Sequence, residues 1–160
     1  MGLIQLPTFK MRPDEQIVPL TYEHLFAMKL GRHEREYEKH IPGYLDYVWD
    51  NSVLGWSYTA IGKGRVICCF GVREIWKGVV ECWFIPGEGL NEHARSTLVG
   101  ARAILQDVMD NYGITRMQIY VKCDHPIAVR FAKALYFDIE CRLRQYGPEG
   151  ADYYSMARFD

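Results

Sequence analysis

Three runs of β-forming residues follow one another in the middle of the chain, and they constrain its fold more than any other feature. The runs cover residues 56–61, 65–73 and 79–85. The connections between them, Gly62-Lys63-Gly64 and Trp76-Lys77-Gly78, are short and carry glycine. Connections of this kind join neighbouring strands as hairpins. We therefore predict an antiparallel meander of three strands.

A long amphipathic helix is predicted directly after the meander. Asn91 offers a side-chain cap for its first turn, and Gly113 stands where such a helix would end. Its apolar stripe consists of Ala94, Leu98, Ala101, Leu105, Val108 and Tyr112. Residues 116–122 then read as a strand. Because a helix separates this strand from the meander, the two can pair in parallel, and the pattern predicts a mixed sheet.

The elements before the meander are shorter. Residues 16–20 read as an edge strand, because Pro19 cannot donate to a ladder. Thr21 caps a first helix that is expected over residues 22–30, with Leu25, Met28 and Phe26 on one face. Residues 32–51 predict one or two short helices, interrupted by a Pro-Gly pair.

The elements after residue 122 complete the predicted order. Pro126 suits the first turn of a helix, in which Ile127, Phe131 and Leu135 are expected to face inward. Residues 139–145 and 152–159 form a closing hairpin.

Composition limits the number of domains and the classes of partner. A chain of 160 residues that is 49% hydrophobic can bury one substantial core, so we predict one α/β domain over residues 1–160, with residues 1–13 as a polar lead-in. Nineteen basic and twenty acidic residues nearly cancel, which gives no bulk electrostatic case for nucleic acid or an anionic membrane. Neither a membrane-spanning run nor a signal peptide is expected.

Cysteine and histidine spacing predicts no metal site. The five cysteines include no CxxC pair and are expected to be reduced, buried thiols of an intracellular protein. His24, His33 and His40 do not match a recognised ligand spacing.

The order of elements resembles that of the GNAT acyltransferase superfamily. The sharpest local similarity is residues 125–137, with a polar cap, an alanine, Arg130-Phe131 and a Leu-x-Phe ending; residues 141–158 also resemble the closing hairpin of that family. The resemblance implies about seven strands and about four helices, in a mixed sheet that splays between its fourth and fifth strands to admit acetyl-CoA. A narrower pattern resembles small GNAT-like internal virion proteins of short-tailed phages. It consists of Glu81 to Ile85, Tyr120-Val121 and Val129 to Lys133.

The family's pyrophosphate loop is altered in this chain. The family pattern has Arg or Gln, two residues, Gly, one residue, then Gly or Ala. Here Gly89 stands at the basic position and Glu92 at the first glycine, so that Glu88 and Glu92 would face the phosphates. Arg95 or Arg102 remains able to reach an anion. A helix start binds anions through its N–H groups, and carboxylates there oppose a phosphate, so loss of CoA binding is favoured over its retention.

The catalytic positions implied by the resemblance are also incomplete. Ala132 stands where many GNAT enzymes have the tyrosine that protonates the leaving thiolate, and an alanine cannot transfer a proton. Other tyrosines qualify only if the fold aims them into the cleft: Tyr112, Tyr120, Tyr136 and Tyr146. Glu81 is the candidate general base, with a paired structural carboxylate as the alternative. His125 is expected to cap a helix, and Cys82 and Cys123 are expected to pack.

These observations favour a GNAT-like domain that acts without acyl transfer. As the phage resemblance implies, it would serve as an internal or assembly-associated virion component, in the virion or the host cytoplasm. Its partners would be other virion or assembly proteins, and it would bind no cofactor. Whether it forms a homo-oligomer stays open. The exposed-looking group Tyr37, Tyr44, Tyr47 and Trp49 is an interface or an intramolecular helix face.

Two alternatives remain open. The first is an active N-acyltransferase that uses acetyl-CoA, with Glu81 as base and an atypical loop. Its cofactor-binding residues would be Trp83, Phe84, Ile85, Gly87 and Gly89. The second is nucleic-acid binding through Arg142, Arg144 and Arg158 on the last hairpin.

Overall fold

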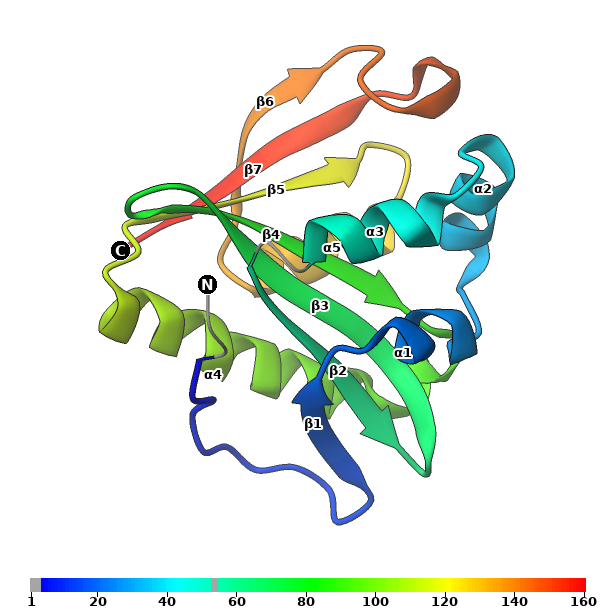
Figure 1. The fold of residues 1–160 in the computed structure, drawn as a ribbon. Helices are drawn as coiled ribbons and strands as arrows, with labels where there is room; N and C mark the ends of the chain where they lie inside the picture. The colour runs from blue at the N-terminus through cyan, green and yellow to red at the C-terminus, as the bar shows by residue number, and fades with distance from the viewer. Residues whose placement is uncertain (1–3, 53–54) are drawn as a thin grey trace.

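A mixed sheet of seven strands organises the computed structural model, which describes residues 4–52 and 55–160. The strands are β1 (Glu15–Pro19), β2 (Trp56–Gly62), β3 (Arg65–Trp76), β4 (Val79–Pro86), β5 (Arg116–Lys122), β6 (Asp138–Leu143) and β7 (Tyr153–Phe159). Their order is β1-β2-β3-β4-β5-β7-β6, and the β4–β5 pair is parallel whereas the other neighbours are antiparallel. The predicted meander, parallel strand and closing hairpin are confirmed (Figure 1).

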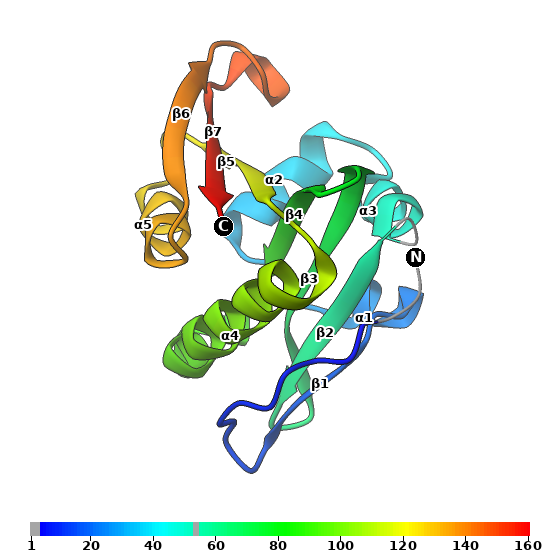
Figure 2. The same cartoon turned by 90° about the vertical axis from the view of Figure 1, so that its left-hand side faces the viewer.

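Helices cover both faces of the sheet. They are α1 (Tyr22–Ala27), α2 (Arg32–His40), α3 (Tyr44–Ser52), α4 (Ala94–Tyr112) and α5 (Pro126–Ala134), with short 3-10 helices at Glu88–His93 and Pro148–Gly150. Figure 2 shows α4 and α5 on one side of the sheet and α1 and α3 on the other. Of the residues that the structure describes, none belongs to a helix that is long and apolar enough to cross a membrane.

Each face of the sheet has its own hydrophobic cluster. Val80, Val108, Met117, Phe137 and Met156 belong to the larger cluster, beneath α4 and α5. The smaller cluster lies beneath α1–α3 and includes Leu25, Leu45, Cys69 and Ile85. Side chains alternate along a strand, so neighbouring residues of β4 contribute to opposite clusters.

The ends of two predicted helices differ from expectation. The first helix stops at Ala27, because Met28 already has extended backbone angles, and Phe26 is 47% exposed instead of facing inward. Asn91 does not cap α4; it lies inside the 3-10 helix, and His93 occupies the cap position. The predicted end at Gly113 is confirmed, where the left-handed φ of 67° suits glycine.

Most of the predicted stripe of α4 faces the core: Val108 is buried, and Leu98, Ala101 and Leu105 pack against the larger hydrophobic cluster. The two ends of the stripe differ, because Ala94 is exposed and Tyr112 is 37% exposed. The N-terminal lead-in also packs on the helix: a β-carbon at Gly100 would lie 2.8 Å from the ring of Phe9. Ile4 is also buried, and its carbonyl accepts the Tyr58 hydroxyl at 2.8 Å. The prediction that residues 1–13 form only a polar lead-in is therefore wrong for Ile4 and Phe9.

Helix α5 begins at Pro126 as predicted, but its inward face is different. Ile127 is 65% exposed, whereas Ala132 and Leu135 are buried and Phe131 is half-buried. In the first turn, Ala128, three residues before Phe131, packs against the larger hydrophobic cluster instead of Ile127.

Candidate functional site

A splay between β4 and β5 opens the centre of the sheet. In the part of the chain that the structure describes, the two strands pair at Val79 with Arg116, Val80 with Met117 and Glu81 with Gln118, and not beyond. After Glu81 the strands diverge, as Figure 1 shows. The splay that the sequence resemblance implied is confirmed.

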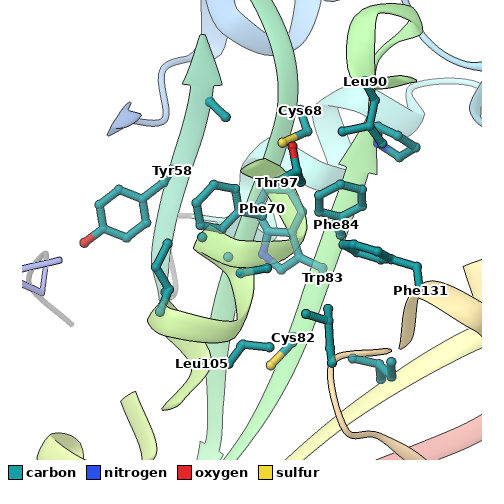
Figure 3. Close-up of a pocket in the computed structure, with 18 of the residues that line it drawn as sticks. Tyr58, Cys68, Phe70, Cys82, Trp83, Phe84, Leu90, Thr97, Leu105 and Phe131 are labelled. Carbon is teal, nitrogen blue, oxygen red and sulfur yellow. The ribbon is translucent and has the colours of Figure 1, made fainter. Parts of the chain in front are cut away.

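An apolar cavity of about 590 Å³ runs along this splay, which we call the cleft. On the side of α4 and α5, Cys82 and Phe84 of β4 and Ile119 and Val121 of β5 line it. Figure 3 shows Phe84 opposite Phe131 of α5, and their ring centroids lie 5.2 Å apart. The volume is within the range of small-molecule sites.

Tyrosine rings dominate the other end of the cleft, on the side of α2. We call Tyr37, Tyr44, Tyr120, Tyr146 and Tyr153 the tyrosine cluster. Ring centroids lie 5.6 Å apart for Tyr37 and Tyr44, 5.2 Å for Tyr120 and Tyr146, and 5.5 Å for Tyr146 and Tyr153. All except Tyr146 line the cleft directly. Four elements far apart in sequence, α2, α3, β5 and the β6–β7 hairpin, therefore build one aromatic wall.

Helix α2 contacts the C-terminal half of the sheet across the splay. The ring of His33 stacks on that of His125 with centroids 3.7 Å apart, the hydroxyl groups of Tyr37 and Tyr153 are hydrogen-bonded, and His40 Nδ1 lies 3.1 Å from Glu149. His125 also accepts the N–H of Ala128, which confirms its predicted cap role. Burial and the neighbouring His33 lower the pKa of His125.

The loop between β4 and α4 is closed by protein hydrogen bonds. The N–H groups of Gly87, Glu88 and Leu90 donate to the carbonyls of Ile67 at 2.8 Å, Lys29 at 2.8 Å and Gly87 at 3.2 Å. A β-carbon at Gly87 would lie 2.9 Å from the Ile67 carbonyl, so glycine here permits close packing; Gly89 has open space around it. These N–H groups are therefore engaged before any anion arrives.

The carboxylates of this loop are paired on the surface. Glu88 lies 2.7 Å from Arg35, and Glu92 lies 3.0 Å from Lys63. The hydrogen bond from Lys63 lowers the pKa of Glu92. Arg102 does not reach toward an anion, because it donates to the Ala134 carbonyl at 2.8 Å.

A buried polar cluster lies at the base of the same loop, where sequence reasoning placed nothing. The Glu15 carboxylate accepts the Nδ1–H of His93 at 2.6 Å and the Ser96 hydroxyl at 2.7 Å. The Glu15 and His93 side chains are only 7% and 3% exposed. Burial opposes ionisation of Glu15, but hydrogen bonds from His93, Ser96 and the Arg12 backbone hold its pKa below the usual value. This cluster joins β1 to the start of α4.

The predicted catalytic positions are separated by the fold. Glu81 lies at the cleft but pairs with Arg73 at 3.4 Å, which fits the structural alternative. Ala132 is buried. Of the four candidate tyrosines, Tyr120 lines the cleft, and the ring of Tyr146 stacks on the ring of Tyr120. Tyr112 packs on Trp56 instead. Tyr136 lies outside the cleft, under the guanidinium groups of Arg102 and Arg158.

The predicted cofactor-binding residues lie on both faces of β4. Phe84 faces α5, and Trp83 lines the opposite part of the cleft. Ile85 is buried beneath α1–α3.

Cys82 and Cys123 are expected to pack. Burial raises the pKa of the Cys82 thiol to about 12. Cys123 does not line the cavity but follows β5 directly. A thiol with a raised pKa is a poor nucleophile, which favours the packing role.

Two predicted surface groups are divided by the structure. Arg158 is 6% exposed and packs against α4 and α5, so it cannot share a basic surface with Arg142, which pairs with Asp152 at 2.7 Å. In the other group, Tyr37 and Tyr44 line the cleft, while Tyr47 is 63% exposed. The interpretation as an intramolecular helix face therefore fits Tyr37 and Tyr44 but not Tyr47.

Comparison with solved structures identifies the fold. A GNAT-family acetyltransferase from Bacillus anthracis matches with a TM-score of 0.69 at 13% identity, covering 95% of this chain and 98% of that chain. Ard1 from Thermoplasma volcanium matches with a TM-score of 0.68 at 17% identity, covering 91% and 97%. The protein yncA from Salmonella typhimurium, solved with its cofactor acetyl-CoA, matches with a TM-score of 0.61 at 12% identity, covering 91% and 94%.

No protein-family model and no curated protein sequence matches the chain. Structural similarity at such low identities establishes the fold alone. The chain thus has the GNAT acetyltransferase fold.

Proposed function

We propose that this GNAT-fold protein does not use acetyl-CoA and instead works by docking to other proteins. The closed loop between β4 and α4 carries the proposal. A pyrophosphate site on a helix N-terminus needs unengaged N–H groups. Here Gly87, Glu88 and Leu90 already donate to backbone carbonyls, and the nearby cations Arg35 and Lys63 are already paired with the loop carboxylates.

Position 132 supports the same proposal. The alanine there has no proton to give a departing thiolate, and it is buried. Burial also raises the pKa of Tyr153 to about 12, so this hydroxyl is a weak acid at neutral pH. Among the four candidate tyrosines, Tyr120 alone lines the cleft. An acetyl-transfer step would therefore lack a held cofactor and would depend on this one hydroxyl as its acid.

Acetyl-CoA is expected to give no saturable heat in isothermal titration calorimetry, even at about 1 mM, the upper end of ordinary KM values. Circular dichroism of the same sample establishes that the protein is folded. Saturation at one acetyl-CoA per chain would refute the proposal.

Exposed aromatic side chains support docking. One row of residues paired in register crosses β3, β4, β5 and β7; in this order it consists of Trp76, Val79, Arg116 and Phe159. Residues opposite each other on neighbouring strands share a face. Trp76 is 69% exposed and Phe159 is 58% exposed. Large exposed aromatic side chains near one another are typical of protein interfaces.

We infer that the docking partners are virion or assembly proteins of a phage. This inference rests on the resemblance of residues 81–85, 120–121 and 129–133 to internal virion proteins. The protein would then be present in purified particles at a fixed copy number. Quantitative mass spectrometry of washed particles measures this number, and absence from the particles would remove the inference.

An N-acyltransferase is the second candidate function. The observation that favours it is the splay, which leaves β4 beyond Glu81 unpaired toward β5, as a pantetheine arm would require. Glu81 would act as the base, the backbone of Trp83, Phe84 and Ile85 would pair with the arm, and Gly87 and Gly89 would hold the pyrophosphate. The calorimetric titration distinguishes the two candidates, because only this one predicts saturation.

A further inference from the structure

The α2 end of the cleft has the composition of a site for an organic cation. Tyr37, Tyr44, Trp83, Tyr120 and Tyr153 line it with their rings. The faces of aromatic rings carry negative electrostatic potential and attract cations within about 6 Å of the ring centroid. Burial raises the pKa of Tyr44 and of Tyr153 to about 12, so both phenols are neutral at physiological pH and act through their rings.

Two carboxylates stand at the same wall. Glu34 and Glu81 both line the cleft. Among residues 4–52 and 55–160, no basic side chain lies within 4.0 Å of the Glu34 carboxylate, whereas Glu81 is paired with Arg73. Burial raises the pKa of Glu34, and only its own backbone N–H and the nearby Arg35 oppose this shift. A cation bound among the rings would favour the ionised carboxylate further.

The basic groups around this wall are already engaged or uncharged. Lys122 lies 3.6 Å from Asp124, and Arg35 lies 2.7 Å from Glu88. Burial lowers the pKa of His125, so this ring is mostly neutral at pH 7. These groups oppose a bound cation only weakly.

The tyrosine hydroxyl groups decide which cation fits. Tyr37 and Tyr153 are hydrogen-bonded to each other, and the Tyr120 hydroxyl accepts from Gln118 at 3.1 Å. A primary ammonium has three N–H donors, for which these hydroxyl groups offer few free acceptors and the carboxylates of Glu34 and Glu81 are the remaining ones. A methylated ammonium needs no acceptor and gains from contact with the ring faces.

We propose that the tyrosine cluster and Trp83 bind a methylated ammonium head group. Such a head group has no N–H to acylate, so the site is a binding site and not an acceptor site for acyl transfer. It is independent of acetyl-CoA, and separate titrations with acetyl-CoA and with a methylated ammonium test the two proposals separately.

Choline and its uncharged isostere 3,3-dimethylbutan-1-ol test the role of charge. We expect choline to bind about tenfold more tightly than the isostere, the size of a cation–π contribution at a partly desolvated site. Calorimetry measures the binding. Equal affinities, or no binding of choline, would overturn the proposal. Because a trimethylated lysine has the same head group, a parallel titration with Nε-trimethyl-lysine distinguishes a small molecule from a protein side chain as the source.

Three variants locate the site. Tyr120→Leu removes a ring and should weaken choline binding about tenfold, whereas Tyr120→Phe keeps the ring and should retain it. Tyr47→Leu is the matched control, because Tyr47 is 63% exposed and does not line the cleft. Circular dichroism checks that each variant is folded. If Tyr120→Phe lost binding as fully as Tyr120→Leu, or Tyr47→Leu weakened it equally, the rings of the cluster would not be the binding site.

Discussion

Replacing Glu15 by alanine is expected to lower the free energy of unfolding by about 1–3 kcal/mol, the usual cost of leaving buried hydrogen-bonding groups without their partner. The carboxylate is 7% exposed and holds both His93 and Ser96. Without it, the Nδ1–H of His93 and the Ser96 hydroxyl remain buried without this acceptor. Urea denaturation at pH 7 measures the change.

The same variant tests the pH dependence of stability. The pKa of Glu15 in the folded protein lies below its usual value of 4.5. A lowered pKa contributes stability that is present above the unfolded pKa and lost as pH falls through the folded pKa. The difference between wild type and Glu15→Ala should therefore shrink below pH 4.5.

Asp14 provides the control for Glu15, because it is its neighbour in the chain and its side chain is exposed. Asp14→Ala should change the free energy of unfolding by less than about 0.5 kcal/mol, as is usual at exposed positions. If Glu15→Ala cost no more than Asp14→Ala, the buried cluster would not hold β1 to α4.

Phe137→Ala is expected to destabilise the protein by about 3–5 kcal/mol, the range for large-to-small changes of buried aromatic residues. Phe137 is 1% exposed and belongs to the larger hydrophobic cluster, where the end of α5 meets β6. Truncation leaves a cavity that the neighbouring strands cannot fill by collapsing. Thermal and chemical denaturation both measure the loss.

Ile127→Ala is the matched comparison for Phe137→Ala. The sequence pattern placed Ile127 inward, but its side chain is 65% exposed. The substitution should therefore change stability by less than about 0.5 kcal/mol. A cost above about 2 kcal/mol, typical of a buried isoleucine, would restore the inward placement.

Local signals in the sequence were enough to predict most of the fold. Hairpins depend on short glycine-bearing connections, and the end of α4 depends on Gly113, so both can be recognised from neighbouring residues. Asn91 failed as a cap because the 3-10 helix Glu88–His93 leads directly into α4. The first N–H of that 3-10 helix, at Glu88, donates to the Lys29 carbonyl, a contact between segments that are distant in sequence. Phe9 on Gly100 is a second long-range contact, and no local pattern indicates it.

Less of the site was predictable, for the same physical reason. The resemblance to a family indicated Glu81, the altered loop and Ala132, because these positions follow a motif. The tyrosine cluster follows none, since Tyr37 and Tyr153 are 116 residues apart and meet only when α2 crosses the splay. The cluster of Glu15, His93 and Ser96 likewise joins segments that no local pattern relates.

The position of α2 has a kinetic consequence. Its side chains contact His125 and Tyr153 on one side of the cleft and Glu88 on the other. None of the residues of α2 is buried. A helix anchored by surface contacts opens at a lower free-energy cost than the core. A guest at the tyrosine end would therefore have one wall of low local stability, which favours faster exchange than a site enclosed by core elements alone.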